Sequence, residues 1–342
     1  MRPAPPPAPG PILTVTLNLA LDVTYTADGV DWDGVNRVRA VHRRAGGKGV
    51  NVARVLAGLG RDVLVTGLSG GSNGRAAEAD LAGAGLPAAL TRIGGESRAT
   101  LAVCDLHPSG PRRTALFNEP GPVVSGGEVA AFLAGFEARL GTAAAVVVSG
   151  SLPPGVPAGF YAVLASRARA RGVPVIVDAD GEALRHAPAG RPSIVKPNAE
   201  ELARALAAPS GGGPARRGTA SRPEDRAGRR SGDVLGGAEA LREAGAGAVV
   251  VSLGAGGLLA VTSEGSWRAA MPYRVEGNPT GAGDALVAGL ALGLVEGSSW
   301  PDRLRRAAAL GAAAVAAPVA GEIDADVFRE VHPLIRVETA DP

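Results

Sequence analysis

The chain has 342 residues, 46% of them hydrophobic, enough for one large domain or for a large domain with a small appendage. Its formal net charge is +2, but residues 208–231 carry six arginines against two acids. The rest of the chain therefore has a net charge of −2, so the basic isoelectric point is no argument for a nucleic-acid surface on the folded body. The longest apolar runs are shorter than the roughly 18 residues of a membrane-spanning helix.

Two segments have little apolar surface to bury. Residues 1–11 are rich in proline and lack the apolar core of a signal peptide, so we expect a disordered tail on a soluble, cytoplasmic protein. Residues 208–233 are rich in Gly, Arg, Ser and Pro, which predicts a disordered insertion. The single cysteine, Cys104, excludes an internal disulfide framework.

From residue 12 onward, short apolar runs alternate with alanine-rich helical segments. Strands are predicted over 12–17, 63–68, 145–149, 174–178, 194–196, 248–253 and 258–261. Helices are predicted over 50–59, 74–84, 157–171, 199–207, 237–244, 282–294, 302–316 and 325–331. Continuous apolar strands between helices indicate an α/β sandwich with a mostly parallel sheet, buried on both faces.

Residues 22–44 and 92–118 depart from this rhythm. Both segments show strand-like alternation, and neither contains a strong helical pattern between its strands. We expect them to form a small antiparallel sheet that acts as a lid beside the main domain.

Only two of the 35 basic residues are lysines, Lys48 and Lys196. Both lie in motifs with glycine or proline neighbours. A lysine ammonium is a compact charge on a thin stem, whereas a guanidinium is a broad planar fork. A glycine-walled phosphate pocket can require the compact charge. The alternative is that two rare residues fell there by chance.

A glycine-rich segment leads into the helix predicted over 282–294. Gly281 and Gly283 allow a close backbone approach, and the first N–H groups of the helix are free to bind an anion. Asp284, at the helix start, is a candidate general base facing a substrate hydroxyl. The alternative is that it is an ordinary first-turn acid favoured by the helix dipole.

A second glycine motif, residues 46–51, opens the helix predicted over 50–59. It is not a Walker A loop, because Gly49 follows Lys48 where that motif has Ser or Thr. Asn51 lies on the first helical turn, where its amide can bind sugar hydroxyls; the alternative is a glycine-rich turn with a helix cap. The four histidines have no metal-ligand spacing.

These two motifs, in this order and at opposite ends of an α/β chain, resemble the signatures of the PfkB carbohydrate kinases of the ribokinase-like superfamily. The first runs over residues 46–60 and the second over 279–285. The resemblance implies one domain over residues 12–338, a three-layer αβα sandwich with a mostly parallel central sheet and a small antiparallel β lid.

Within the family, the chain is most similar to the kinases of phosphorylated hexoses. The segments carrying this similarity are 16–22, 97–100, 149–153 and 196–201. In two departures, Leu19 stands where the subgroup commonly has proline, and Asn278 where many members have aspartate. Neither departure removes a catalytic group.

The resemblance implies a role for each motif residue. Catalysis is assigned to Asp284, the base, with Gly281, Ala282 and Gly283 around the transferred phosphoryl group. Sugar-phosphate binding is assigned to Asp22, Gly47, Lys48, Asn51, Arg98 and Ser149. Nucleotide binding is assigned to Lys196, Asn198, Ser252, Gly254 and Gly257, and Mg²⁺ binding to Asn198 and Glu201 through water.

The expected activity is ATP-dependent phosphorylation of fructose 1-phosphate to fructose 1,6-bisphosphate. Two phosphorylated ligands in one cleft repel each other, and the cations Lys48, Arg98 and Lys196 favour a phosphorylated acceptor over ribose. Tagatose-6-phosphate kinase and 6-phosphofructokinase activities stay open, as does a non-catalytic sugar-phosphate sensor. The resemblance also implies a homodimer formed through the lid. Composition and charge predict no membrane or nucleic-acid partner.

Overall fold

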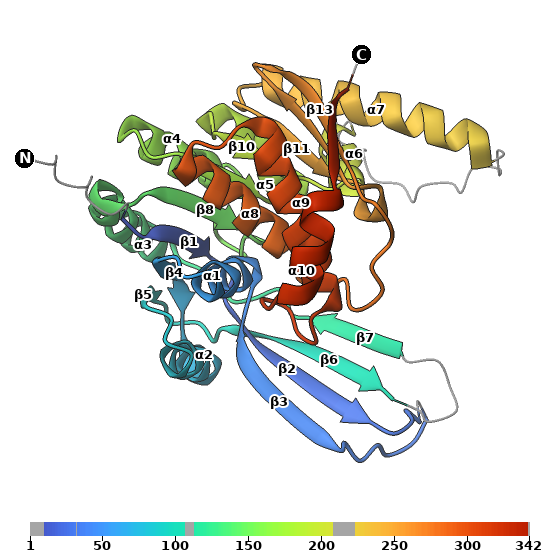
Figure 1. Ribbon diagram of the computed structural model, residues 1–342. Helices are drawn as coiled ribbons and strands as arrows, with labels where there is room; N and C mark the ends of the chain where they lie inside the picture. The colour runs from blue at the N-terminus through green and yellow to red at the C-terminus, as the bar shows by residue number, and fades with distance from the viewer. Residues whose placement is uncertain (1–9, 32, 107–112, 208–222, 341–342) are drawn as a thin grey trace, which may run out of the picture.

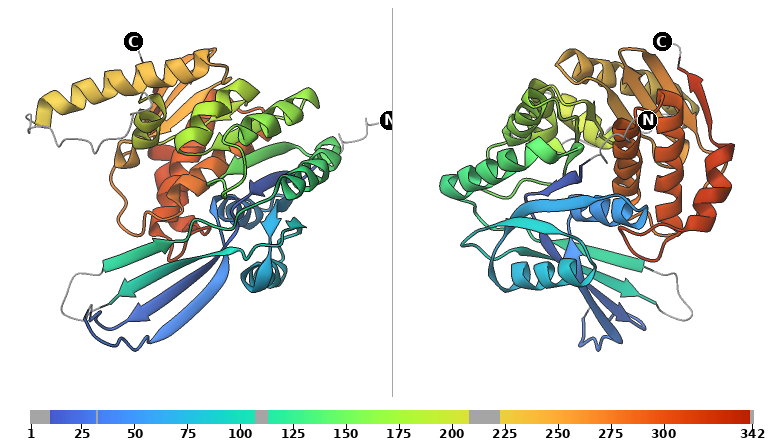
Figure 2. Two further views of the ribbon diagram at one scale, coloured as in Figure 1. Left: turned by 180° about the vertical axis from the view of Figure 1, so that it is seen from behind. Right: turned by 60° about the vertical axis from the view of Figure 1, so that its left-hand side comes forward.

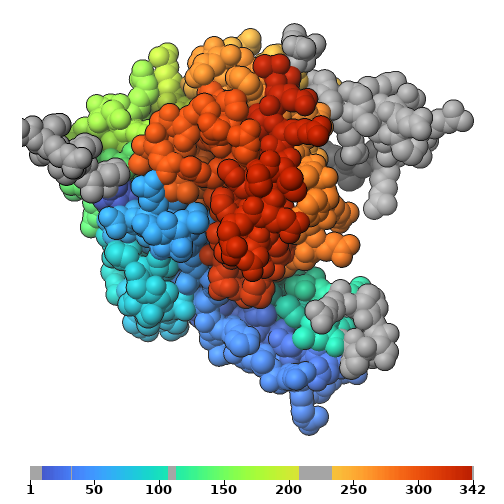
Figure 3. Space-filling view, in the orientation of Figure 1, coloured from blue at the N-terminus to red at the C-terminus, as the bar shows by residue number. Residues whose placement is uncertain are grey.

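The computed structural model describes residues 10–31, 33–106, 113–207 and 223–340 (Figure 1). These residues form a body, in which a ten-stranded sheet lies between two layers of helices, and a four-stranded sheet that projects from it (Figures 1 and 3). The predicted tail, apart from residues 10 and 11, lies outside the described residues, as do residues 208–222 of the predicted insertion.

The strand order of the large sheet is β14-β13-β12-β11-β10-β9-β8-β1-β4-β5. Neighbours from β5 to β11 pair in parallel, and β12, β13 and β14 are added antiparallel. The mostly parallel sheet is therefore confirmed; β5, β13 and β14 were not predicted. The strands are β1 Ile12–Thr16, β4 Val63–Ser69, β5 Ala88–Arg92, β8 Ala145–Ser149, β9 Val175–Asp178, β10 Ile194–Val195, β11 Val249–Ser252, β12 Leu258–Thr262, β13 Gly265–Ala270 and β14 Arg336–Thr339.

Helices cover both faces of this sheet (Figure 2). One layer consists of α1 Lys48–Gly58, α2 Gly71–Gly83, α8 Ala282–Glu296, α9 Trp300–Ala316 and α10 Ala325–Val331. The other consists of α3 Gly126–Arg139, α4 Phe160–Ala170, α5 Gly181–His186, α6 Ala199–Leu206 and α7 Pro223–Glu243. No helix in the described ranges is long and apolar enough to span a membrane.

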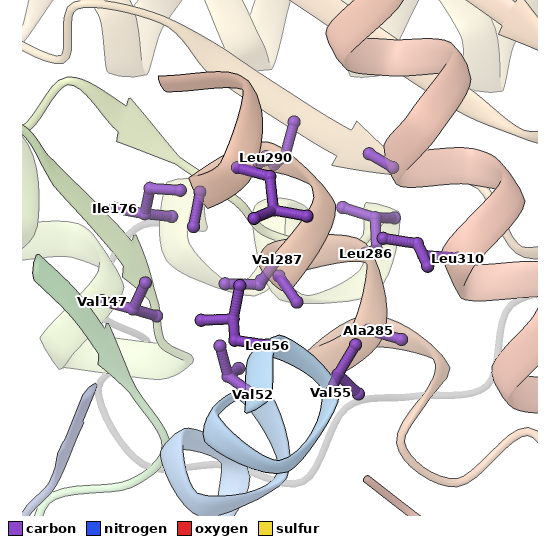
Figure 4. Packing of buried hydrophobic residues seen from close by; sticks show 14 of the residues in the cluster. Val52, Val55, Leu56, Val147, Ile176, Ala285, Leu286, Val287, Leu290 and Leu310 are labelled. Atoms are coloured by element: carbon purple, nitrogen blue, oxygen red, sulfur yellow. The ribbon is translucent and has the colours of Figure 1, made fainter. Parts of the chain in front are cut away.

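The central strands read as continuous apolar runs because they contribute to both cores. Along β8, Val147 faces the cluster that contains α1 and α8, whereas Val146 and Val148 face the cluster under α3 and α4. Figure 4 shows Val147 and Ile176 beside side chains from α1 and α8. A parallel sheet buried on both faces requires this pattern.

The lid is a four-stranded sheet of order β3-β2-β6-β7. Its strands are β2 Ala20–Ala27, β3 Ala40–Gly46, β6 Arg98–Asp105 and β7 Arg113–Asn118. The β2–β3 and β6–β7 pairs are antiparallel, as expected, but the central β2–β6 pair is parallel. It is parallel because β2 and β6 both leave the body at the same edge and run outward together (Figure 1).

Three helices differ from the sequence prediction. Helix α5 was not predicted. Helix α3 was missed, although Ser125 and Glu128 form a capping box at its start. Helix α7 begins at Pro223, so the part of the predicted disordered insertion after residue 222 is helical. Its C-terminal half is anchored by the buried Ala238 and Leu241. Extending a formed helix costs less free energy than starting one, which accounts for the extra turns.

Candidate active site

Polar side chains gather where neighbouring parallel strands end. Ser149 is the last residue of β8, Asp178 is the last of β9, and Lys196 directly follows β10. Since β8, β9 and β10 are adjacent in the sheet, their carboxyl ends bring these three residues together. Open α/β sheets place their ligand sites at this edge.

The fully buried carboxylate of Asp178 is the centre of this group. It accepts a hydrogen bond from Ser149 Oγ (2.9 Å), and its Oδ1 lies 3.1 Å from Lys196 Nζ. Its Oδ2 lies 3.5 Å from Lys48 Nζ. Burial acts to raise the pKa of Asp178, but Lys196 and Lys48 outweigh it and hold the pKa below its ordinary value. The only two lysines of the chain therefore share one carboxylate.

Lys48, the first residue of α1, lies between two acids. Besides Asp178, its Nζ lies 3.7 Å from Glu201 Oε1. Asp178 raises the pKa of Lys48 against the opposing effect of burial, with Glu201 adding to the rise, so the ammonium stays charged. Its expected place beside the sugar phosphate is compatible with this position, because Lys48 also lines the cleft described below.

Asn198 and Glu201 form a reciprocal capping box at the start of α6. Asn198 Oδ1 accepts from Glu201 N (2.8 Å), and Glu201 Oε2 accepts from Asn198 N (2.8 Å). This arrangement leaves Glu201 Oε1 facing Lys48. The buried Glu201 is thus fixed by the backbone it caps.

Asp284 lies in the first turn of α8 and is 6% exposed. Its Oδ2 accepts a hydrogen bond of 2.8 Å from Asn51 Nδ2 on α1. Burial raises the pKa of Asp284 to about 7, helped by the negative charge of Asp178 and opposed by Lys48, Asn51 and Lys196. A carboxylate with a pKa near 7 is suited to taking a proton at neutral pH.

The glycines before Asp284 allow close packing around the start of α8. Gly281 has φ +87°, and a Cβ there would approach Ala320 Cα to 2.9 Å. A Cβ on Gly283 would lie 3.4 Å from Lys196 Nζ, so this lysine stands beside the helix start. Ala282 N donates to Pro279 O (3.2 Å), which leaves the N–H groups of Gly283 and Asp284 as the expected anion donors.

A cleft of about 800 Å³ lies between this group and the root of the lid. Its charged lining residues are Lys48, Arg98, Glu119, Asp180, Glu182 and Glu201. Arg98 is held by the main chain, because its Nε donates to Asn18 O (3.1 Å). Asn18 in turn donates from Nδ2 to Ser151 Oγ and Pro120 O, both at 3.0 Å. The guanidinium is therefore oriented before any ligand binds.

Asp22 and Gly47 lie where the lid joins the body. Gly46 lies directly under the Asp22 carboxylate, so that a Cβ at this position would collide with it. Burial raises the pKa of Asp22, and Arg98 is the largest opposing influence. Gly47 has φ +107° and packs on Thr16, which explains why this turn needs glycine.

The predicted nucleotide loop lies one strand further along the sheet. Ser252 ends β11 and forms an isolated bridge with Asn198. Gly254 and Gly257 have φ of +58° and +88°, and a Cβ on Gly257 would collide with Ala269 O. The loop thus adjoins the Asn198 cap but does not line the 800 Å³ cleft.

The structure brings most predicted site residues to one edge of the sheet, and it adds two that the sequence prediction missed. Asp178 ends a predicted strand, so its position at the carboxyl edge was a usable signal. Asn18 gave none, because its role depends on loops more than 100 residues away.

The acids of this edge fit a hydrated magnesium ion. The described residues contain no cluster of three or more metal-ligating side chains. Asp178 and Glu201 nevertheless lie on either side of Lys48 and are both buried. Mg²⁺ keeps several waters and is commonly held by one or two carboxylates together with substrate phosphates. Two carboxylates match that requirement.

Comparisons with known proteins identify the family of the chain. The family model described as pfkB family carbohydrate kinase matches residues 15–325. Phosphofructokinase-2 from Escherichia coli in complex with potassium is 30% identical, with a TM-score of 0.80 over 95% of this chain and 99% of that chain. A possible 1-phosphofructokinase from Thermotoga maritima is 25% identical, with a TM-score of 0.76 over 96% and 99%. Ribokinase from Arabidopsis thaliana, at 20% identity and a TM-score of 0.66 over 95% and 99%, supports the fold alone.

Proposed function

The chain belongs to the pfkB family of carbohydrate kinases, and we propose that it phosphorylates fructose 1-phosphate to fructose 1,6-bisphosphate with ATP. The observation that carries a kinase reaction is the Asn51–Asp284 hydrogen bond of 2.8 Å, which orients a buried carboxylate beside a glycine-lined helix start. Such a site combines a base with donors for a phosphoryl group.

Asp284 is the general base in this proposal. Asn51 holds Oδ2, which leaves Oδ1 to take the proton of the acceptor hydroxyl. The N–H groups of Gly283 and Asp284 then stabilise negative charge on the transferred group. Lys196, 3.1 Å from Asp178 and beside Gly283, neutralises charge on the nucleotide side. Positioning and electrostatics supply most of the rate in phosphoryl transfer.

The magnesium ion of the nucleotide would be held by Asp178 and Glu201, with Asn198 behind them through water. When bound, it neutralises phosphate charge. Lys48 lies between the two carboxylates, with its Nζ 3.5 Å from Asp178 and 3.7 Å from Glu201. Ser252, Gly254 and Gly257 would line the nucleotide site beside Asn198.

A phosphorylated acceptor is supported by the cations of the cleft. Arg98 is oriented by Asn18 O, and Lys48 lines the same cleft. The two would bind the phosphate that the sugar already carries, with Asp22 on its ring hydroxyls and Ser149 behind Asp178. Fructose 6-phosphate is the second candidate, because the E. coli phosphofructokinase-2 structure in complex with fructose-6-phosphate is 29% identical over 95% of this chain.

An ADP-release assay tests this proposal directly. The purified chain is supplied with ATP, Mg²⁺ and, in turn, fructose 1-phosphate, fructose 6-phosphate, tagatose 6-phosphate and ribose. We expect the highest kcat/KM with fructose 1-phosphate, and a kcat/KM at least about 100-fold lower with the Asp284→Asn variant. A higher kcat/KM with fructose 6-phosphate or tagatose 6-phosphate would make that sugar the substrate in place of fructose 1-phosphate. A preference for ribose would contradict the proposal that the acceptor is a hexose phosphate. Binding without turnover on every sugar would indicate a sensor.

The lid also supports a homodimer. Val41, Leu116 and Phe117 are exposed on its strands, and β3 and β7 are its two edges. A short sheet with apolar edges is stabilised by pairing with another copy. Sedimentation of the full chain should give a dimer, and Phe117→Glu should give a monomer; a monomeric wild type would contradict the proposal.

A further inference from the structure

Arg54 and Asp80 form an ion pair outside the cleft, at the junction of lid and body. Arg54 extends from α1 and Asp80 from α2, with side chains 13% and 31% exposed. Arg54 Nη2 donates to Asp80 Oδ2 and also lies 3.4 Å from Ala45 O. Ala45 N donates to the same Asp80 oxygen (2.8 Å). The pair therefore holds both main-chain groups of Ala45.

Ala45 lies one residue before the turn on which the substrate site depends. Gly46 supports the Asp22 carboxylate, and Gly47 is the cap residue of α1. Lys48 follows as the first helical residue. A small displacement of Ala45 would move Gly46, which packs against the Asp22 carboxylate. It would also move the start of α1, the helix that carries Lys48 and Asn51.

The aliphatic part of Arg54 packs against a second element of the site. Gly321, with φ +81°, lies so close that a Cβ there would approach Arg54 Cδ to 3.0 Å and Asn51 Cα to 3.3 Å. Its neighbour Ala320 backs Gly281 at the start of α8. Arg54 thus touches the segment that packs behind the anion-binding helix start.

Within the described residues, Arg54 Nε is buried without a hydrogen-bond partner. Leaving a buried donor unpaired costs free energy, so stability alone is a weak reason for an arginine here. The same side chain contacts the Ala45 turn and the Ala320–Gly321 segment, and it lies one helical turn from Asn51. Arg54 therefore packs against two segments that border the candidate active site.

We propose that Arg54 and Asp80 are a positioning pair that fixes the Gly46–Lys48 turn for the sugar phosphate. The inference rests on the proposed kinase function and deepens it. Neither residue touches the substrate. Both act through Ala45, so their loss displaces Lys48 and Asp22, on the sugar side, and leaves Lys196 and the Asn198 cap in place. A misplacement of about 1 Å can cost about 100-fold in rate.

The test compares Arg54→Met, Asp80→Asn and the double variant with wild type. Each single variant should raise the KM for the hexose phosphate about tenfold or more, while the KM for ATP changes less than about twofold. Because the residues act as a unit, the double variant should be no worse than the more damaging single variant. Arg54→Lys, which keeps one donor, covers the case in which Arg54→Met does not fold, and it should show a smaller rise.

Arg61→Met is the matched control. Arg61 follows the same helix and pairs with Glu296, with side chains 33% and 31% exposed. It contacts no part of the Gly46–Lys48 turn in the structure, so both KM values should match wild type. Equal rises in the two KM values of Arg54→Met, a wild-type KM in that variant, or multiplied effects in the double variant would overturn the positioning pair.

Hydrogen exchange separates this inference from the proposed function. The Ala45 amide is bonded to Asp80 Oδ2, so it should exchange at least about tenfold faster in Asp80→Ala, which removes that acceptor, and in Arg54→Met than in Arg61→Met. Unchanged exchange would contradict the pair even in an active enzyme. If wild type turned over no hexose phosphate, the proposed function would fail, while exchange would still decide whether the pair fixes the turn.

Discussion

The charged groups supplied by the body and by the lid are buried to different extents. The body supplies Asp178, Lys196, Glu201 and Asp284, all of them less than 10% exposed. The lid supplies Asp22 and Arg98, which are only partly buried, on a sheet whose outer strand β7 is mostly exposed. We call the first set the body-side cluster and the second the lid-side cluster.

This difference separates chemistry from recognition. The body-side cluster is held by parallel strands and helix caps, so its geometry is fixed by the core and its charges act at low dielectric. The lid-side cluster lies where β2 and β6 leave the body, and its two side chains are only partly buried, so water screens their charges more strongly. Substitutions in the first should therefore change kcat, and substitutions in the second should change the KM for the sugar phosphate.

The largest expected effect is that of Asp284→Asn in the body-side cluster. The amide can still accept from Asn51 but cannot take a proton, so kcat should fall by about 100- to 10,000-fold. The Kd for the sugar phosphate, measured by calorimetry, should change little. Near-wild-type kcat would remove Asp284 from the role of base.

Asp178→Asn should give the next largest loss. It removes the charge shared by Lys48 and Lys196, and a fall in kcat of about 10- to 100-fold is expected. Steady-state kinetics would measure it, with Asp326→Asn as the control: Asp326 pairs with Arg329 on the exposed face of α10. Equal kcat in the two variants would contradict a shared role for Asp178.

Arg98→Ala probes the lid-side cluster. Losing a charge-assisted contact to the sugar phosphate should raise its KM by about 10- to 100-fold, while the KM for ATP stays near wild type. Arg92→Ala, which removes an exposed arginine from β5, is the control and should change neither constant. A parallel rise in both KM values would place Arg98 on the nucleotide side.

The two lysine-to-arginine variants test whether the site requires a compact charge, in the body-side cluster at Lys196 and beside it at Lys48. Lys196 is 3% exposed and adjoins Gly283, so the broader guanidinium of Lys196→Arg should lower kcat. Lys48 has a side chain that is 39% exposed, and Lys48→Arg should have a smaller effect. Steady-state kinetics of both variants tests this expectation. Wild-type kcat and KM values in both would mean that a compact charge is not required at either position.

The sequence allowed the body to be predicted more fully than the lid and the contacts between loops. Strands such as β8 and β9 are apolar on both faces, which identified a buried parallel sheet, and Asp284 was recognisable from the glycines before it. The parallel β2–β6 pairing was missed, because alternation reveals a strand but not its partner. Asn18 was missed because local sequence does not reveal its partners, Pro120 and Ser151, which lie on distant loops.

The ion pairs of Asp178 and the raised pKa of Asp284 could not be predicted from the sequence. Asp178 was visible only as the end of a strand, and its two lysine partners lie 130 residues and 18 residues away along the chain. A pKa near 7 for Asp284 depends on burial and on Asp178, neither of which local spacing encodes. Such effects arise only once the strands are assembled.

The dependence of kcat/KM on pH, compared between wild type and Asp178→Asn, tests the central claim most directly. Asp284 must be deprotonated to act, and its pKa is about 7, so wild-type kcat/KM for the hexose phosphate should rise with pH to a half-maximum near pH 7. The negative charge of Asp178 raises the pKa of Asp284. Removing that charge in Asp178→Asn should therefore lower the pKa and move the half-maximum to lower pH. An unchanged half-maximum in Asp178→Asn, or a pH-independent wild type, would contradict a base tuned by the body-side cluster.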